Sequence, residues 1–170
     1  MKENSIEIET LKKVNCPLDV IAHVEAVTKL ALDIGMTVKV VEVDMETLRL
    51  GAMYHDIGRS QTHGIAHGVE GVRIARGLGF DEKVLYIIER HIGSGLTMDE
   101  ARALGLPPKD YLPETVEEKI VAYADNLVVG VKVVTFEEAL GRFKRRLGSQ
   151  NPAVFRFINL HEEIYSWMKL

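Results

Sequence analysis

Cysteine is almost absent from this 170-residue chain, which excludes two ways of holding a small fold together. The single residue, Cys16, cannot form an internal disulfide framework or a thiolate zinc knuckle, and so low a content is typical of a reducing compartment. A chain of this length buries about 70% of the surface it exposes when unfolded, so a core can form without cross-links. We therefore expect one domain over residues 1–170 and a cytoplasmic location.

Long apolar runs and an excess of positive charge are also missing. The first thirteen residues, MKENSIEIETLKK, alternate charge with isolated Ile and Leu, unlike a signal peptide, and no segment approaches the ~20 apolar residues of a membrane span. The formal net charge of −4 argues against a protein that mainly grips a nucleic-acid backbone. We expect neither a membrane nor a nucleic acid as partner, whereas this charge does not exclude a small phosphorylated metabolite.

Apolar residues recur at helical spacing along most of the chain. Pro17 stands where a long helix begins, and Asp44 and Asp81 precede apolar stripes as N-caps. Gly35 and Gly79 lie near expected helix ends. The sequence therefore predicts an all-α, single-domain bundle of about seven or eight helices.

Two segments interrupt this helical pattern. The β-branched run 38–43 contains Lys39 and Glu42 and leads into an N-cap, so we interpret it as a connector. Residues 93–113 hold three prolines and three glycines, which predicts a long excursion with one short helix at 97–104. Three more helices are predicted over residues 113–128, 135–147 and 152–168.

The segment YHDIGR at residues 54–59 places an imidazole and a carboxylate together at the end of an apolar helix. Burying a histidine or an aspartate costs free energy unless the group is paired or binds a metal. On its own, the pair His55 and Asp56 is equally compatible with a core histidine beside a capping aspartate. The choice between these interpretations depends on other parts of the chain.

Further potential ligands face inward from other helices. His23 and Asp125 lie on apolar stripes, His67 begins a predicted helix, and His91 ends another. His67 and His91 are each readily explained alone as a hydrogen-bonded histidine, whereas a lone carboxylate on the apolar side of its helix, as at Asp125, costs free energy. Together they bring imidazole and carboxylate groups from several helices toward one place, which is how metal sites are built in helical bundles.

The order H, HD, D at His23, His55-Asp56 and Asp125 resembles the HD-domain metal-dependent phosphohydrolases, an all-helical family. The HDIG form of the motif is complete at residues 55–58, and His67 and His91 match two further histidines of the binuclear branch. The resemblance covers about residues 16–130 and leaves the helices of 131–170 as family-specific additions.

The resemblance implies that Asp56 bridges two divalent transition-metal ions, with water completing each shell. One ion would also take His23, His55 and Asp125, and the other His67 and His91. Imidazole and carboxylate ligands suit Fe, Mn, Co, Ni or Zn, so the donor set does not identify the metal. His63 lies at helical spacing before His67, and either can supply the ligand if the loop is extended; the following Gly71 favours His67.

The resemblance also implies hydrolysis of a nucleotide-like phosphomonoester or phosphodiester by water that the cations activate. Asp56 and Asp125 are candidate proton acceptors, and Arg59 is expected to bind phosphate, or else to be a solvated charge. His63 and Asn126 are weaker substrate candidates. The basic run at Arg142, Lys144, Arg145 and Arg146 is either a solvated helix face or an attractor of anions.

Two alternatives stay open at this stage. The same four histidines and two aspartates serve a di-iron oxygenase in some HD-domain proteins, and other HD proteins are regulatory domains that bind metal or nucleotide without turnover. The sequence leaves the oligomeric state open, and an oligomer is compatible with it.

Overall fold

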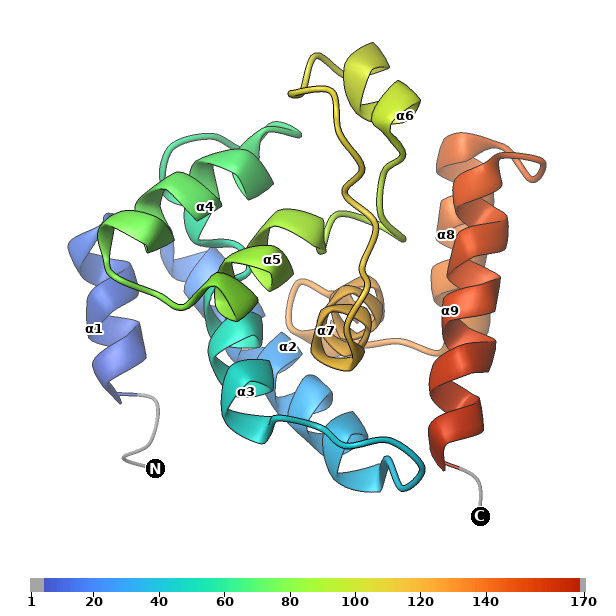
Figure 1. Cartoon of the computed structure of the whole chain (residues 1–170), viewed down its shortest axis with the longest axis horizontal. Coiled ribbons are helices and arrows are strands. Elements are labelled where there is room, and N and C mark those ends of the chain that lie inside the picture. The colour runs from blue at the N-terminus through green and yellow to red at the C-terminus, as the bar shows by residue number, and fades with distance from the viewer. Residues whose placement is uncertain (1–4, 169–170) are drawn as a thin grey trace.

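The computed structural model describes residues 5–168, which form nine α-helices, one 3-10 helix and one small β-hairpin (Figure 1). The expected all-α bundle is confirmed, with one or two more helices than the sequence predicts. In chain order the elements are α1 (Ser5–Lys13), α2 (Leu18–Thr37), α3 (Met45–Tyr54), η1 (Ile57–Ser60), α4 (His67–Gly77), α5 (Glu82–Arg90), α6 (Met98–Ala103), α7 (Val116–Asn126), β1 (Val128–Val129), β2 (Lys132–Val133), α8 (Phe136–Leu147) and α9 (Pro152–Met168). Among these helices none is both long and apolar enough to span a membrane.

The helix starts follow the capping chemistry of the sequence. The side chain of Asp44 accepts a hydrogen bond from the Thr47 amide at 3.0 Å, and Asp81 caps α5 in the same way. Thr97 and Thr135 form full capping boxes at the starts of α6 and α8. Residues 38–43 form no strand, so the predicted connector is confirmed.

Helix α1, the 3-10 helix η1 and the β-hairpin were not predicted. Helix α1 buries Leu11 fully and places Glu7 2.9 Å from Arg49 of α3. After α7 the chain makes a hairpin in which Val128 pairs with Val133, and Gly130 turns with φ +62°. A β-branched run around a glycine that can adopt positive φ is a hairpin signal, and it stands in the sequence as VVGVKV.

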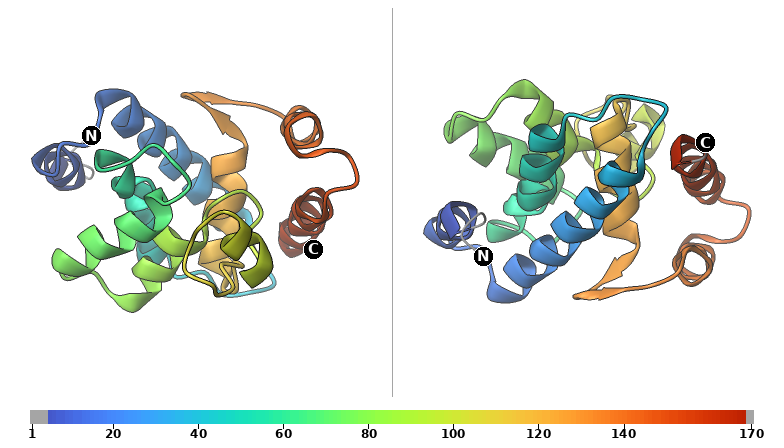
Figure 2. Two further views of the ribbon diagram at one scale, coloured as in Figure 1. Left: turned by 90° about the horizontal axis from the view of Figure 1, so that it is seen from above. Right: turned by 90° about the horizontal axis from the view of Figure 1, so that it is seen from below.

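Helix α7 is the central element of the bundle and is seen end-on in Figure 1. It packs against α2, α3 and α5 on one side and against α9 on the other. Buried residues of these helices, including Val27, Ile120 and Phe157, form the larger apolar core. Figure 2 shows α8 and α9 set apart from the N-terminal helices, with α7 between them. A polar side chain near the end of α7 is therefore surrounded by several helices.

The excursion between α5 and α7 is anchored at two points. Leu96 and Tyr111 form a short antiparallel backbone bridge that closes it, and Arg156 of α9 holds Glu100 of α6 at 2.7 Å. The second contact joins the excursion to the C-terminal pair of helices. Both parts consequently border the same cavity, which is described below.

Candidate metal centre and its cavity

Six ligand-type side chains converge where several helices end. His55 directly follows α3, His91 directly follows α5, and His67 is the first residue of α4. The other members come from α2, from the turn before η1 and from the last turn of α7. The full set is His23, His55, Asp56, His67, His91 and Asp125.

All four imidazoles are held through their Nδ1 atoms. His55, His67 and His91 each donate this N–H to the backbone carbonyl three residues earlier, at 2.7 to 2.8 Å. His23 donates to the carbonyl of Gly130 at 2.7 Å. Since a carbonyl oxygen only accepts, Nδ1 carries the proton and each Nε2 atom is turned toward the centre of the cluster. Sequence reasoning missed Gly130, because the hairpin that supplies it was not expected.

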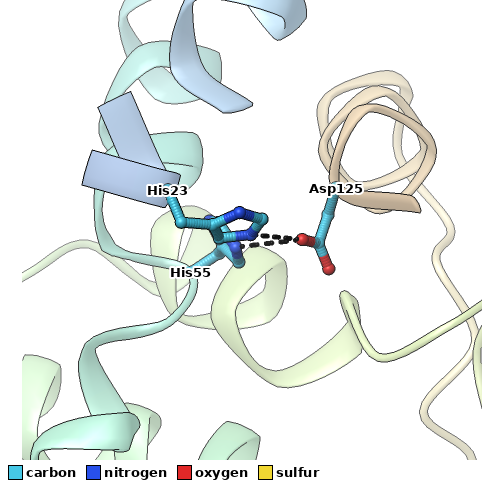
Figure 3. A group of neighbouring side chains, drawn as sticks. All are labelled: His23, His55 and Asp125. Atoms are coloured by element: carbon cyan, nitrogen blue, oxygen red, sulfur yellow. Dashed lines mark hydrogen bonds and ion pairs between the residues drawn. The ribbon is translucent and has the colours of Figure 1, made fainter. Parts of the chain in front are cut away.

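The first group of potential ligands contains His23, His55 and Asp125 (Figure 3). Nε2 of His23 lies 2.9 Å from Oδ1 of Asp125, and Nε2 of His55 lies 3.5 Å from the same oxygen. Burial lowers the pKa of His23, but the hydrogen bond and charge of Asp125 outweigh burial and raise it. The two imidazoles thus share one carboxylate oxygen.

The second group forms around Oδ1 of Asp56. This oxygen lies 3.3 Å from Nε2 of His67 and 3.4 Å from Nε2 of His91, and the two nitrogens are 3.0 Å apart. Burial lowers the pKa of His91, so its Nε2 carries a bare lone pair when Nδ1 holds the proton. Lone pairs that face each other in a buried site are unfavourable unless a proton or cation lies between them.

Two buried atoms of the cluster also lack the partner that a bound cation would supply. Among the residues that the structure describes, Nε2 of His55 and Oδ1 of Asp56 are fully buried yet have no hydrogen-bond partner. Such atoms are rare in folded proteins because each forfeits the hydrogen bonds it makes in water. The donor set and these unsatisfied atoms together fit a divalent cation bound at the cluster.

The charges of the cluster stabilise one another. Burial lowers the pKa of His55, but the carboxylates of Asp56 and Asp125 outweigh it and raise that pKa to about 9. Burial raises the pKa of both carboxyl groups, whereas neighbouring imidazoles, His55 foremost, outweigh burial and hold them well below their usual range. Both aspartates are therefore carboxylates at neutral pH, as metal ligands must be.

Arg59 and His63 lie beside the cluster rather than in it. Nε of Arg59 contacts Oδ2 of Asp56 at 2.8 Å, and its Nη1 donates to the His63 carbonyl at 3.3 Å. The His63 side chain is exposed at the cavity, while His67 lies in the cluster. Asn126 donates one hydrogen bond to the Gly93 carbonyl at 2.7 Å and so braces α7 against the loop after α5.

Gly58 allows α4 to approach the HD turn closely. A Cβ atom at this position would lie 1.8 Å from the carbonyl oxygen of His67 and 2.6 Å from the amide of Gly71. The requirement is for space rather than for an unusual backbone angle, because the φ angle of Gly58 is not positive. The glycine of the HDIG segment thereby brings His67 within reach of Asp56.

The cluster opens onto a cavity of about 1130 Å³. His23, Asp56 and Asp125 line one part of it, and Arg142, Arg145 and Arg146 of α8 also line it. Ligand pockets in proteins typically measure about 300–1000 Å³, so there is room for a substrate larger than a phosphate ion. The basic run thus borders the same space as the ligand cluster, and Lys144 does not.

Comparison with known proteins agrees with this geometry. Residues 20–130 match the HD domain family. An uncharacterized protein of Methanocaldococcus jannaschii is 52% identical over 156 residues, which cover 91% of this chain and 92% of that protein. The crystal structure of the L. monocytogenes phosphodiesterase PgpH HD domain superposes with a TM-score of 0.56 at 19% identity, over 92% of this chain and 95% of that one, and shows the shared fold.

Two longer relatives are named tRNA (cytidine(56)-2'-O)-methyltransferase. The protein of Picrophilus torridus is 39% identical over 92% of this chain, and that of Thermoplasma volcanium is 42% identical over 84%. The chain spans only 44% and 40% of their respective lengths. Since the family match covers well over half of the chain, including the HD turn and the end of α7, the chain belongs to the HD domain family.

Proposed function

We propose that this protein is a metal-dependent phosphohydrolase that cleaves a nucleotide-like phosphomonoester or phosphodiester. The observation that carries the proposal is the convergence of four Nε2 atoms and two carboxylates on one buried cluster beside a cavity. Membership of the HD domain family and the fold shared with a phosphodiesterase HD domain support the same class of reaction.

The six side chains would hold two divalent cations. His23, His55 and Asp125 would hold one, and His67 and His91 the other. Asp56 would serve both, because its Oδ1 atom faces His67 and His91 while its Oδ2 atom lies 3.7 Å from Nε2 of His55. Bound cations would supply activation of water and neutralisation of phosphate charge.

The protein's own groups would orient the substrate and take up the proton of the attacking water. Asp125 lines the cavity with 21% of its side chain exposed, so it can accept a proton from the attacking water. Arg59 also lines the cavity, and its guanidinium group would offer a charged donor to a phosphate oxygen. Burial of the cluster under α3, α4 and α5 limits water on the opposite side.

The longer relatives bear on the class of substrate. Their names connect a region similar to this chain with proteins that act on tRNA, although the chain spans less than half of each. We take nucleotides, including those released from RNA, as the first class of phosphoester to test.

A turnover screen tests the proposal. Protein loaded separately with Mn²⁺, Fe²⁺, Co²⁺, Ni²⁺ and Zn²⁺ is incubated with bis(p-nitrophenyl) phosphate, p-nitrophenyl phosphate and a panel of nucleoside phosphates. We expect metal-dependent release of product that Asp56→Ala abolishes. Release that survives in Asp56→Ala would point to a contaminant. Absence of product with every metal would refute hydrolysis. Oxygen uptake by the iron-loaded sample in that case would favour the oxygenase.

A further inference from the structure

The arginines of α8 differ from every other arginine of the chain. The sequence has ten arginines, and seven of them lie within 4.0 Å of a carboxylate oxygen. Within residues 5–168, the three without such an ion pair are Arg142, Arg145 and Arg146. All three line the cavity that contains Asp56 and Asp125.

Helix geometry explains why these three act together. Positions 142, 145 and 146 are spaced i, i+3 and i+4, so they share one side of α8, while Lys144 projects from the other side. Like charges at this spacing repel one another. The negative end of the helix dipole favours cations in the last turn, but it does not select one side and does not reach Arg142. The placement is better explained by an anion in the cavity.

We propose that Arg142, Arg145 and Arg146 form a second phosphate-binding subsite, so that the preferred substrate carries a further phosphate remote from the one that is hydrolysed. This inference rests on the proposed function and narrows its substrate class. Helix α8 lies outside residues 20–130, so the subsite lies beyond the part of the chain that matches the HD domain family.

The cavity and the remaining charges agree with such a substrate. Glu100 also lines the cavity, but it is held by Arg156, and Asp56 is held by Arg59. The unpaired charge on the α8 wall is therefore positive. Arginine binds phosphate through two parallel N–H donors, and three such side chains within about 6 Å of helix length can surround one phosphate or two adjacent ones.

Matched substrate pairs test the proposal and separate two sources of the second phosphate. Adenosine 5'-triphosphate is compared with the 5'-monophosphate, and the dinucleotide pApA with ApA, which lacks the terminal phosphate. In at least one pair we expect the member with the remote phosphate to show about tenfold or higher kcat/KM. The pair that responds identifies a polyphosphate chain or an oligonucleotide as the source.

Variants connect this preference to α8. The triple variant Arg142→Gln/Arg145→Gln/Arg146→Gln should abolish the preference while leaving turnover of p-nitrophenyl phosphate within about twofold. Lys144→Gln removes one charge from the same helix outside the cavity and should keep the preference. Because all four side chains are exposed, the variants should fold, and circular dichroism checks this. No preference in the wild type, or one that persists in the triple variant, would overturn the proposal.

A binding experiment keeps the test independent of turnover. Calorimetric titration with inorganic tripolyphosphate should give a dissociation constant at least about tenfold weaker for the triple variant than for the wild type and Lys144→Gln. If no substrate is hydrolysed but this difference appears, the proposed function fails and the subsite stands. Equal affinities in all three proteins would refute the subsite whatever the outcome of the turnover screen.

Discussion

Replacing Gly58 by alanine tests whether the HD turn positions His67. The added Cβ atom would lie 1.8 Å from the His67 carbonyl oxygen, and Cβ atoms essentially never approach closer than 3.0 Å, so the start of α4 must shift by about 1.2 Å. Metal ligands are placed to within about 0.2 Å, so the shift should remove His67 from the second cation that we propose. Overpacking of this kind costs about 1–3 kcal/mol of stability, and each kcal/mol lowers Tm by about 2–4 °C in a domain of this size.

The measurement combines thermal unfolding with elemental analysis of protein that was grown with ample metal. We expect Gly58→Ala to unfold earlier and to lose about one of two metal equivalents, while His23, His55 and Asp125 retain the other. Gly77→Ala is the matched control, because a Cβ atom there meets nothing within 4 Å, and it should be neutral or slightly stabilising. A Gly58→Ala protein with wild-type Tm and metal content would show that close packing at this turn does not position the ligand.

Three further outcomes are expected. The double variant His67→Ala/His91→Ala should halve the metal content measured by elemental analysis, and unchanged stoichiometry would leave a mononuclear site. Arg59→Ala should bind metal at least as tightly as wild type by calorimetry, because the substitution removes a positive charge that contacts Asp56. Its kcat should nevertheless fall about 10²-fold, and Arg59→Lys should restore only part of the loss. Unchanged kcat would make Arg59 a surface charge. Burial foremost, with the charge of Asp56, raises the pKa of Cys16 to about 11, so only about 0.1% of this thiol is thiolate at pH 8. Native protein should therefore react with Ellman's reagent only upon unfolding. Rapid reaction of the native protein would contradict this.

Much of the fold was predictable because the responsible interactions are local. Caps at Asp44, Asp81 and Thr97 act on backbone amides within three residues, so the sequence alone specifies where those helices begin. Helix α1 was not predicted, since its nine residues carry only two buried side chains and depend on the contact of Glu7 with Arg49. Short helices of this kind are stabilised by tertiary contacts rather than by propensity.

The histidines of the candidate site also differ in whether local sequence or tertiary structure sets the orientation of their rings. His55, His67 and His91 each use a carbonyl three residues earlier, and for His55 and His91 this carbonyl lies at a helix end. Carbonyls at a helix end lack a partner within the helix, so the orientation of these two rings follows from local sequence. His23 differs, because its Nδ1 partner is Gly130, 107 residues away in a hairpin. Its orientation depends on tertiary structure, which no local pattern encodes.

The basic run of α8 shows what tertiary structure adds to a sequence pattern. From the sequence, Arg142, Lys144, Arg145 and Arg146 form one patch with two equally simple explanations, a solvated face or an anion site. Folding divides the patch, since the three arginines line the cavity of the HD cluster and Lys144 does not. The helix also carries Phe143 into the core, where it stacks on Phe157 at 4.5 Å. That contact fixes the rotation of α8 about its axis and thereby decides which basic side chains line the cavity. A smaller residue at position 143 should therefore weaken the binding of tripolyphosphate without removing any charge.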